Sequence, residues 1–271
     1  MPERRLNRSQ TAARLRELGI ENSRGPAFAY AEELPDVAYD FHAHRRHQLL
    51  YATRGVARLE TRDALYLLPP QRAAWIPAGV RHATRVNGAQ ILSLYFERRL
   101  APALREVRVF DVSPLLREMI VYARRWPLTS KGHGPAALTY FRALLGVSTE
   151  LMQQQRALYQ LPRPASDMTA RALDWMLAHV ATADLTGAAR HARTSPRTLR
   201  RRLESELGLH FRALLRQARM QRAVELLARS SRSVLEVAVE VGFQSQSAFT
   251  QAFRQSTGQT PRGFRSQLLG A

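Results

Sequence analysis

An internal repeat near the C-terminus constrains the fold of this chain more than any other feature. Four residues of one segment recur as residues of similar kind fifty positions later. The first set is Ser195, Leu199, Leu203 and Gly208, and the second is Ser245, Phe249, Phe253 and Gly258. In each copy a serine suited to a helix N-cap precedes two large apolar residues four apart, and a glycine suited to a left-handed helix end follows. The repeat predicts two similar helices, each buried along one side.

A shorter helix is predicted before each copy, so that the region contains two helix-turn-helix motifs. In the first copy the apolar residues of this helix are Leu185, Ala188, Ala189 and Ala192. In the second copy Ser233 and Glu236 form a capping box. Between the copies, residues 211–229 predict a helix about 28 Å long, which would separate the two repeated helices by about one turn of DNA.

The exposed sides of the two repeated helices are the candidate DNA-binding surface. A helical wheel places polar residues opposite the apolar ones, namely Arg197, Arg200 and Arg201 in the first helix and Gln246, Ser247, Thr250 and Gln251 in the second. Arginine can pair with two acceptors of guanine, and the neutral residues can hydrogen-bond to bases or phosphates. A net charge of +19 favours a polyanionic partner, although an arginine-rich face is by itself also typical of a solvated surface.

The segments "SPRTLRRRLESELG", "RMQRAVELLARSS" and "VLEVAVEVGFQSQSAFTQAFRQSTGQTPRGFR" resemble the DNA-binding domain of the AraC/XylS family of bacterial transcription regulators. The resemblance covers residues from about 167 to 267. It implies double-stranded DNA as the partner and the seven polar residues above as recognition positions. Arg193 is a departure, because family members often have glycine there, and a left-handed arginine would cost on the order of 1 kcal/mol.

The N-terminal half shows the short alternating segments of an antiparallel barrel or sandwich. "QLLYA", "VARLET", "ALYLL", "AAWIPA" and "QILSLYF" are separated by turn-forming residues. Helices are then predicted from a Ser113 cap and over residues 135–157, either to cover the barrel or to join two subunits. The prolines of "YQLPRPAS" predict a linker without regular structure.

Histidines gather in "FHAHRRHQ", and a further one ends "PAGVRH". This spacing is similar to the two motifs of cupin barrels, and the resemblance implies a divalent-metal site at His42, His44, Gln48 and His82. Residues 42, 44 and 48 also share a strand parity, whereas His47 is expected to point outward. Gln48 replaces the glutamate of cupins and is a weaker ligand, but three imidazoles can still hold Zn or Ni. The alternatives are histidines that only pack inside the barrel, or that line a pocket for an organic effector.

These observations predict a two-domain protein, with an N-terminal all-β cupin-like barrel with flanking helices and a C-terminal all-α double helix-turn-helix. The expected boundaries are an N-terminal extension at 1–24, a sensor and dimerisation domain at 25–160, a linker at 161–165 and the DNA-binding domain at 166–271. No apolar run approaches the ~20 residues of a membrane span, so we expect a cytoplasmic protein without membrane contact.

The expected function is sequence-specific transcription regulation in response to a small-molecule or metal effector. The partners would be DNA, a second copy of the chain and, for an activator, RNA polymerase. One alternative is a constitutive regulator whose barrel only dimerises. Another is a metal-dependent cupin enzyme fused to a DNA-binding domain, but an oxygenase carboxylate is missing and the absence of cysteine excludes a thiolate nucleophile, so we predict no enzyme activity.

Overall fold

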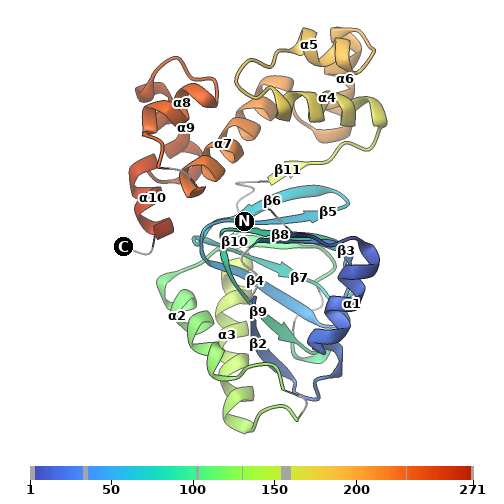
Figure 1. Cartoon of the computed structure of the whole chain (residues 1–271), viewed down its shortest axis with the longest axis vertical. Helices are drawn as coiled ribbons and strands as arrows, with labels where there is room; N and C mark the ends of the chain where they lie inside the picture. Colours follow the sequence, from blue (N-terminus) through green and yellow to red (C-terminus); the bar gives the residue numbers. More distant parts are fainter. Residues whose placement is uncertain are drawn as a thin grey trace. The chain divides into compact units, whose positions relative to one another are not determined.

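The computed structural model describes residues 4–32, 36–101, 104–129, 131–153, 160–229 and 231–269. The chain divides into two compact units. The N-terminal unit comprises Met1–Thr61 and Leu68–Ala157, and the C-terminal unit comprises Arg62–Leu67 and Leu158–Ala271. The first is rich in strands and the second is mainly helical, which confirms the predicted fold class (Figure 1).

Two sheets form the framework of the N-terminal unit. One has the order β10 (Arg108–Asp111), β7 (Arg72–Ile76), β4 (His47–Arg54), β9 (Gln90–Phe96) and β2 (Ala27–Ala31). In the other, β1 (Arg4–Arg5), β3 (Asp36–His42), β8 (His82–Asn87) and β5 (Ala57–Thr61) lie side by side. Strands β3 and β8 were not among the predicted segments, because the polar residues of "DVAYDFH" and "HATRVN" hide their strand pattern.

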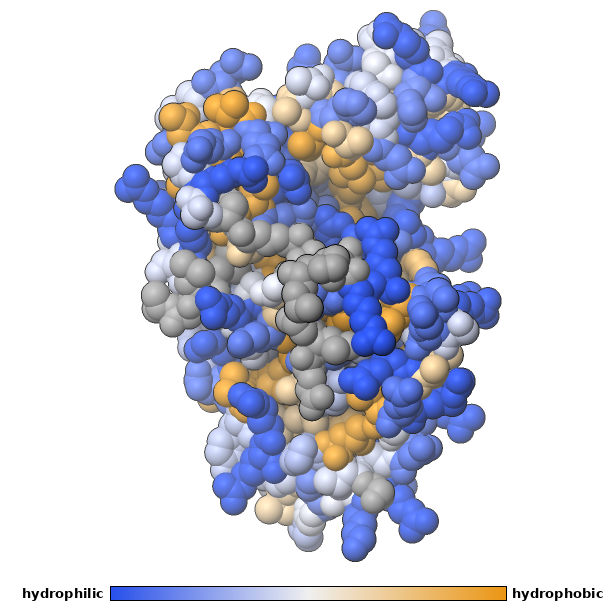
Figure 2. Space-filling view, viewed as in Figure 1, coloured by the Kyte–Doolittle hydropathy of each residue, from blue (hydrophilic) through white to orange (hydrophobic). Residues whose placement is uncertain are grey.

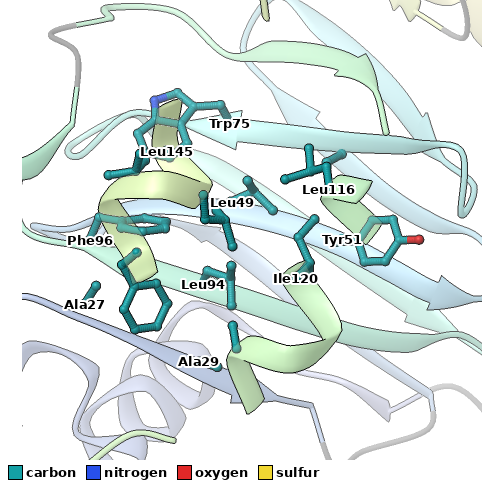
Figure 3. Close-up of a cluster of buried hydrophobic side chains, with 14 of the residues drawn as sticks. Ala27, Ala29, Leu49, Tyr51, Trp75, Leu94, Phe96, Leu116, Ile120 and Leu145 are labelled. Atoms are coloured by element: carbon teal, nitrogen blue, oxygen red, sulfur yellow. The ribbon is translucent and has the colours of Figure 1, made fainter. Parts of the chain in front are cut away.

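Helices α2 (Pro114–Tyr122) and α3 (Pro135–Gln153) cover one face of the β10-β7-β4-β9-β2 sheet (Figure 1). Leu116 and Ile120 from α2 and Leu145 from α3 join Leu94 and Phe96 in the buried cluster (Figure 3). Both helices thus cover the sheet, which was one of the two roles predicted for them; the other was to join two subunits. As predicted, the Ser113 side chain caps α2 by accepting the Leu116 N–H. The part of the second predicted helix that reaches to residue 157 lies outside the described residues.

The N-terminal residues, predicted to be an extension of the sensor, are part of its fold. Helix α1 (Arg8–Leu18) begins with a capping box between Asn7 and Gln10. The Leu6 N–H donates to the Ala38 carbonyl, and the Asp40 N–H donates to Thr11 Oγ1, both over 2.9 Å. These bonds attach the helix to β3, so the helix can contribute to a site on that strand.

The segment predicted to lack regular structure contains a strand, which corrects that prediction. Strand β11 (Gln160–Pro162) pairs antiparallel with β6 (Ala64–Leu68), with Leu161 opposite Leu65. Pro162 is tolerated because β11 is an edge strand, where the missing N–H breaks no ladder. Leu161 is buried among the apolar residues of the helical unit. Packing of this single leucine therefore outweighs the prolines beside it.

In the C-terminal unit, α7 (Phe211–Arg229) joins two groups of three helices (Figure 1). The first half contains α4 (Asp167–Ala178), α5 (Leu185–His191) and α6 (Pro196–Leu207), and the second half contains α8 (Val234–Glu240), α9 (Gln246–Thr257) and α10 (Pro261–Leu269). The predicted caps of α6 and α9 are present, with serine at the start and left-handed glycine at the end. Within the described residues, no helix combines the length and apolarity needed to cross a membrane.

Candidate DNA interface and effector site

Helices α6 and α9 each bury one side and expose the other. Leu199 and Leu203 of α6, and Phe249 and Phe253 of α9, are at most 1% exposed. Six of the seven predicted recognition residues are exposed on the opposite sides, and the seventh, Thr250, is half-buried. Hydrophilic side chains also dominate the face of the first half that is visible in Figure 2. Both helices therefore present polar groups that could enter a groove of DNA.

The turns that lead into α6 and α9 differ in how they are built. Arg193 has a φ of 55° and is the only non-glycine residue with a positive φ in the described part of the chain, so it adopts the left-handed conformation that costs an arginine free energy. In the second turn Gly242 has a φ of 83°. A Cβ atom there would lie 2.3 Å from the Ala181 carbonyl oxygen, so Gly242 is required by close packing as well as by its backbone angle.

Arg219 on α7 connects the two halves and was not identified from the sequence. Its guanidinium donates to the carbonyls of Val180 and Ala181 over 3.1 and 3.0 Å, and lies over the ring of Phe243. Burial lowers the pKa of this arginine. One periodic arginine among many gives no signal of such a role. Arg219 and Gly242 together hold the loop after α4 against the turn before α9.

A groove of about 540 Å³ runs between α7 and α9. Arg212 and Arg216 of α7 and the predicted recognition residue Gln251 line it. The Arg216 side chain donates to Gln255. These two arginines were also missed, because an isolated basic residue on a long helix is usually solvated. They add positive charge beside one of the two polar helix faces.

The three predicted histidine ligands come together in the N-terminal unit. His42 ends β3, His82 begins β8 directly opposite it, and His44 lies in the turn that leads to β4. One potential ligand atom of each lies within 4.8 Å of the others. Tetrahedral Zn–N bonds of about 2.0–2.1 Å place two ligand nitrogens about 3.3 Å apart, so atoms separated by 4.8 Å would have to approach each other by roughly 1.5 Å. We call His42, His44 and His82 the histidine site.

The same backbone interaction orients all three imidazoles. Nδ1 of His42 lies 2.8 Å from the Asp40 carbonyl oxygen, Nδ1 of His44 lies 2.6 Å from that of Arg46, and Nδ1 of His82 lies 2.9 Å from that of Val80. A carbonyl only accepts, so each Nδ1 carries the proton and each Nε2 keeps its lone pair. Nε2 of His82 is buried without a hydrogen-bond partner. Backbone carbonyls orient metal-binding histidines in the same way.

Burial keeps the histidine site uncharged. It lowers the pKa of His42 to about 4 and the pKa of His44 below its usual range. The pKa of His82 is lowered further by burial and by its two neighbours. At neutral pH the site therefore offers lone pairs rather than positive charge, as a cation requires.

The fourth predicted ligand, Gln48, reaches the site from β4. Its Oε1 lies 3.0 Å from His44 Nε2, and its Nε2 donates to Ser93 Oγ over 2.8 Å. If the amide nitrogen and oxygen of Gln48 exchange positions, the amide N–H donates to Nε2 of His44 and the amide oxygen accepts from the Ser93 hydroxyl. The lone pair of His44 then has a hydrogen-bond partner without a metal. His82 then remains the unpartnered residue. His47 lies away from the site as its parity predicts, but it is buried against Trp75 rather than exposed on the outside, which corrects that part of the prediction.

The space beside the histidine site is small and has a polar rim. This cavity of about 30 Å³ also contacts Tyr39, Glu32 and Tyr30, which were not among the residues predicted from the sequence. Tyr39 donates to Glu32 over 2.7 Å, and burial, reinforced by this carboxylate, raises the pKa of both tyrosines, that of Tyr30 to about 12. About 10–15 Å³ holds one water, so the cavity can hold an ion with one or two waters but not an organic molecule.

Comparison with known proteins identifies both units. Residues 25–163 match the model of the AraC-like ligand binding domain, and residues 188–267 match that of a helix-turn-helix domain. The HTH-type transcriptional regulator NimR of Escherichia coli is 29% identical over 89% of this chain and 88% of its own length. The ornithine utilization regulator of Pseudomonas aeruginosa is 39% identical over 30% of this chain and 24% of its own.

Among solved structures, the C-terminal domain of the response regulator AraT from Geobacillus stearothermophilus is 32% identical over 37% of this chain and 85% of its own, with a TM-score of 0.35. The AraC-like model alone spans about half of the chain, and the curated relatives named here are regulators. The chain therefore belongs to the AraC family and is a DNA-binding transcription regulator with an N-terminal ligand-binding domain.

Proposed function

We propose that the chain reads an operator with α6 and α9 in the major groove and adjusts this binding to a divalent metal in its N-terminal unit. The recognition residues would be Arg197, Arg200, Arg201, Gln246, Ser247, Thr250 and Gln251. Their position opposite the buried apolar side of each helix supports this role. Arg212 and Arg216 would contact the phosphate backbone between the two grooves.

The DNA assignment can be tested on an operator selected from random DNA by the full chain. Arg201→Ala should weaken binding about tenfold or more, because a bidentate pair contributes about 1–3 kcal/mol of discrimination. Arg98→Ala removes an equal charge from the N-terminal unit and should have little effect. Equal losses for the two variants, with the same salt dependence, would leave only nonspecific attraction to DNA.

The metal assignment rests on one observation above the others: a ring nitrogen of each of the three histidines lies within 4.8 Å of the other two, and in every case a backbone carbonyl holds the proton on Nδ1 and leaves a lone pair on Nε2. Neutral imidazoles without a carboxylate suit Zn or Ni better than Mg or Ca. The ion would supply the positive charge that the unpartnered Nε2 of His82 lacks. Gln48 would complete the site as a neutral ligand or support His44 from outside it.

Metal content distinguishes this proposal from a barrel that only packs or dimerises. Tag-free protein incubated with Zn or Ni and then desalted should retain about one ion per chain by plasma mass spectrometry. His42→Ala and His82→Ala should lose the ion, whereas His210→Ala, an exposed histidine of the C-terminal unit, should retain it. Thermal unfolding of the variants without added metal checks that they still fold. Retention by both site variants would refute the metal site.

The remaining partners belong to the same proposal. Leu115 and Tyr122 of α2 are 61% and 53% exposed, which favours a homodimer formed through this helix. Light scattering of the Leu115→Glu variant tests the dimer.

RNA polymerase is a partner if the protein activates transcription. We place the protein in the cytoplasm with its DNA target. The regulator relatives favour a sensing role over catalysis for the histidine site.

A further inference from the structure

We infer that an organic anion binds in a second, larger pocket of the N-terminal unit, between α1 and the end of β3. Residues from both elements line it, including Ala12, Leu15, Phe41 and His42. We call it the outer pocket. The inference rests on the proposed function in that the anion would be a second effector of this regulator, beside the metal.

Volume assigns different ligands to the two cavities. The outer pocket measures about 420 Å³, against about 30 Å³ beside the histidine site. Pockets for small organic molecules typically measure about 300–1,000 Å³, so only the outer pocket is large enough for an organic effector. Its apolar residues, among them Leu15, Ile20 and Phe41, fit a ligand with an apolar body.

The charge of the outer pocket indicates the sign of the ligand. Arg8, Arg16 and Arg81 line it, together with a single acidic residue, Glu21. The Glu21 carboxylate accepts the backbone N–H of Arg45 over 2.6 Å, and the three arginines outnumber this one carboxylate. Within the described part of the chain, none of the three arginine side chains pairs with a carboxylate. Arginine binds carboxylate, sulfonate or phosphate groups through paired hydrogen bonds, and an excess of positive charge in a concave site strengthens the attraction.

The outer pocket also borders the histidine site. His42 contacts both cavities, His44 lines the outer one, and Arg81 directly precedes His82. An anion bound there would therefore touch two residues of the metal site and a neighbour of the third. Helix α1 supplies a wall of the pocket, so a ligand would also contact this helix. Such shared contacts are a direct route by which one ligand can alter the binding of the other.

A pair of fluorescent probes tests the sign of charge and the location together. Anilinonaphthalene sulfonate is an organic anion, and phenylnaphthylamine has the same rings without the sulfonate. Titrations use the full chain, the pocket variant Arg16→Gln/Arg81→Gln and a control variant Arg124→Gln/Arg125→Gln. The control loses the same charge from an exposed 3-10 turn of the same unit, outside the pocket. All three proteins are also assayed for metal content and operator binding without probe.

The anionic probe should bind the full chain saturably and bind the pocket variant about tenfold more weakly. The neutral probe should change less than twofold between them, and the control variant should match the full chain. Equal weakening by the pocket and control variants would overturn the inference, as would an equal loss of both probes or the absence of saturable binding. Failure of the full chain to bind an operator or to retain a metal would instead count against the proposed function, so the two failures can be distinguished.

Discussion

The two halves of the C-terminal unit share one topology but differ in their chemistry. The exposed side of α6 carries arginines, whereas that of α9 carries mainly neutral amides and hydroxyls. The turn before α6 contains the left-handed, exposed Arg193, while the turn before α9 contains Gly242 against the Ala181 backbone. The N-caps of the shorter helices, Asp184 and Ser233, are 49 residues apart, so the second turn is one residue longer.

This difference indicates that the two helix-turn-helix motifs contribute differently to DNA binding. The first half can supply most of the charge that attracts DNA, and the second half can supply neutral hydrogen bonds that depend on close fit. Close fit requires a fixed orientation, which Gly242 and Arg219 provide by packing the second turn against the first half. Five measurements test this comparison.

The largest expected effect is on the contact that orients the second half. Gly242→Ala would place a Cβ 2.3 Å from the Ala181 carbonyl at a φ of 83°, and should lower the free energy of unfolding by about 3 kcal/mol. Gly208→Ala is the control, since it has a similar positive φ but open space around it, and should cost about 1 kcal/mol. Urea unfolding measures both. Equal losses would mean that the second turn is not held by this contact.

The salt dependence of operator binding compares the two reading surfaces directly. Arg201→Ala should weaken binding by about 1–3 kcal/mol and make the salt dependence shallower, because one fewer counterion is released. Gln251→Ala should weaken specific binding without changing the slope, since its amide is uncharged. Fluorescence anisotropy over a range of salt concentrations gives both quantities. Identical slopes for the two variants would contradict the division between charged and neutral halves.

A carboxylate anchors the first half and has no counterpart in the second. Glu206 on α6 accepts from the Ser166 N–H and from the hydroxyls of Ser166 and Thr169, at the start of α4. Fifty residues later the position is Ser256. Glu206→Gln should cost about 1–2 kcal/mol of stability at neutral pH, whereas Ser256→Ala should stay within about 0.5 kcal/mol.

The pH dependence of the same variant checks the cause. Burial opposes ionisation of Glu206, but the bonds from Thr169 and Ser166 outweigh it and lower its pKa. The stabilisation should therefore be present at neutral pH and disappear as the pH falls through this lowered pKa. Unfolding curves of the wild type and Glu206→Gln should converge in acid. A constant difference down to the lowest pH would show that the ionised carboxylate is not the source.

The smallest effect on stability and DNA binding is expected from a substitution in the turn before α6. Arg193→Gly should raise the free energy of unfolding by about 1 kcal/mol, because glycine adopts the φ of 55° without strain. Operator affinity should change less than twofold, since the turn geometry is retained. Thermal unfolding and anisotropy provide the two readings. A loss of stability would indicate that the arginine side chain makes a contact that outweighs its backbone strain.

Local signals predicted the C-terminal unit well. Capping by Ser195, Ser233 and Ser245 and left-handed ends at Gly208 and Gly258 depend on residues within one or two helical turns. The sequence therefore shows them directly. Arg219 and Gly242 escaped notice because their partners, Val180 and Ala181, lie about 40 to 60 residues away in the chain.

By itself the sequence determined the repeated helical motifs and the alternating directions of the side chains along β4. It also identified His42, His44 and His82 as candidate metal ligands. Only the tertiary structure decided that these histidines share one tautomer, that α1 belongs to the sensor and that a basic pocket opens beside them. Spacing along a strand or helix fixes which side a residue faces. Which carbonyl, helix or arginine it meets there depends on long-range packing, which no local pattern encodes.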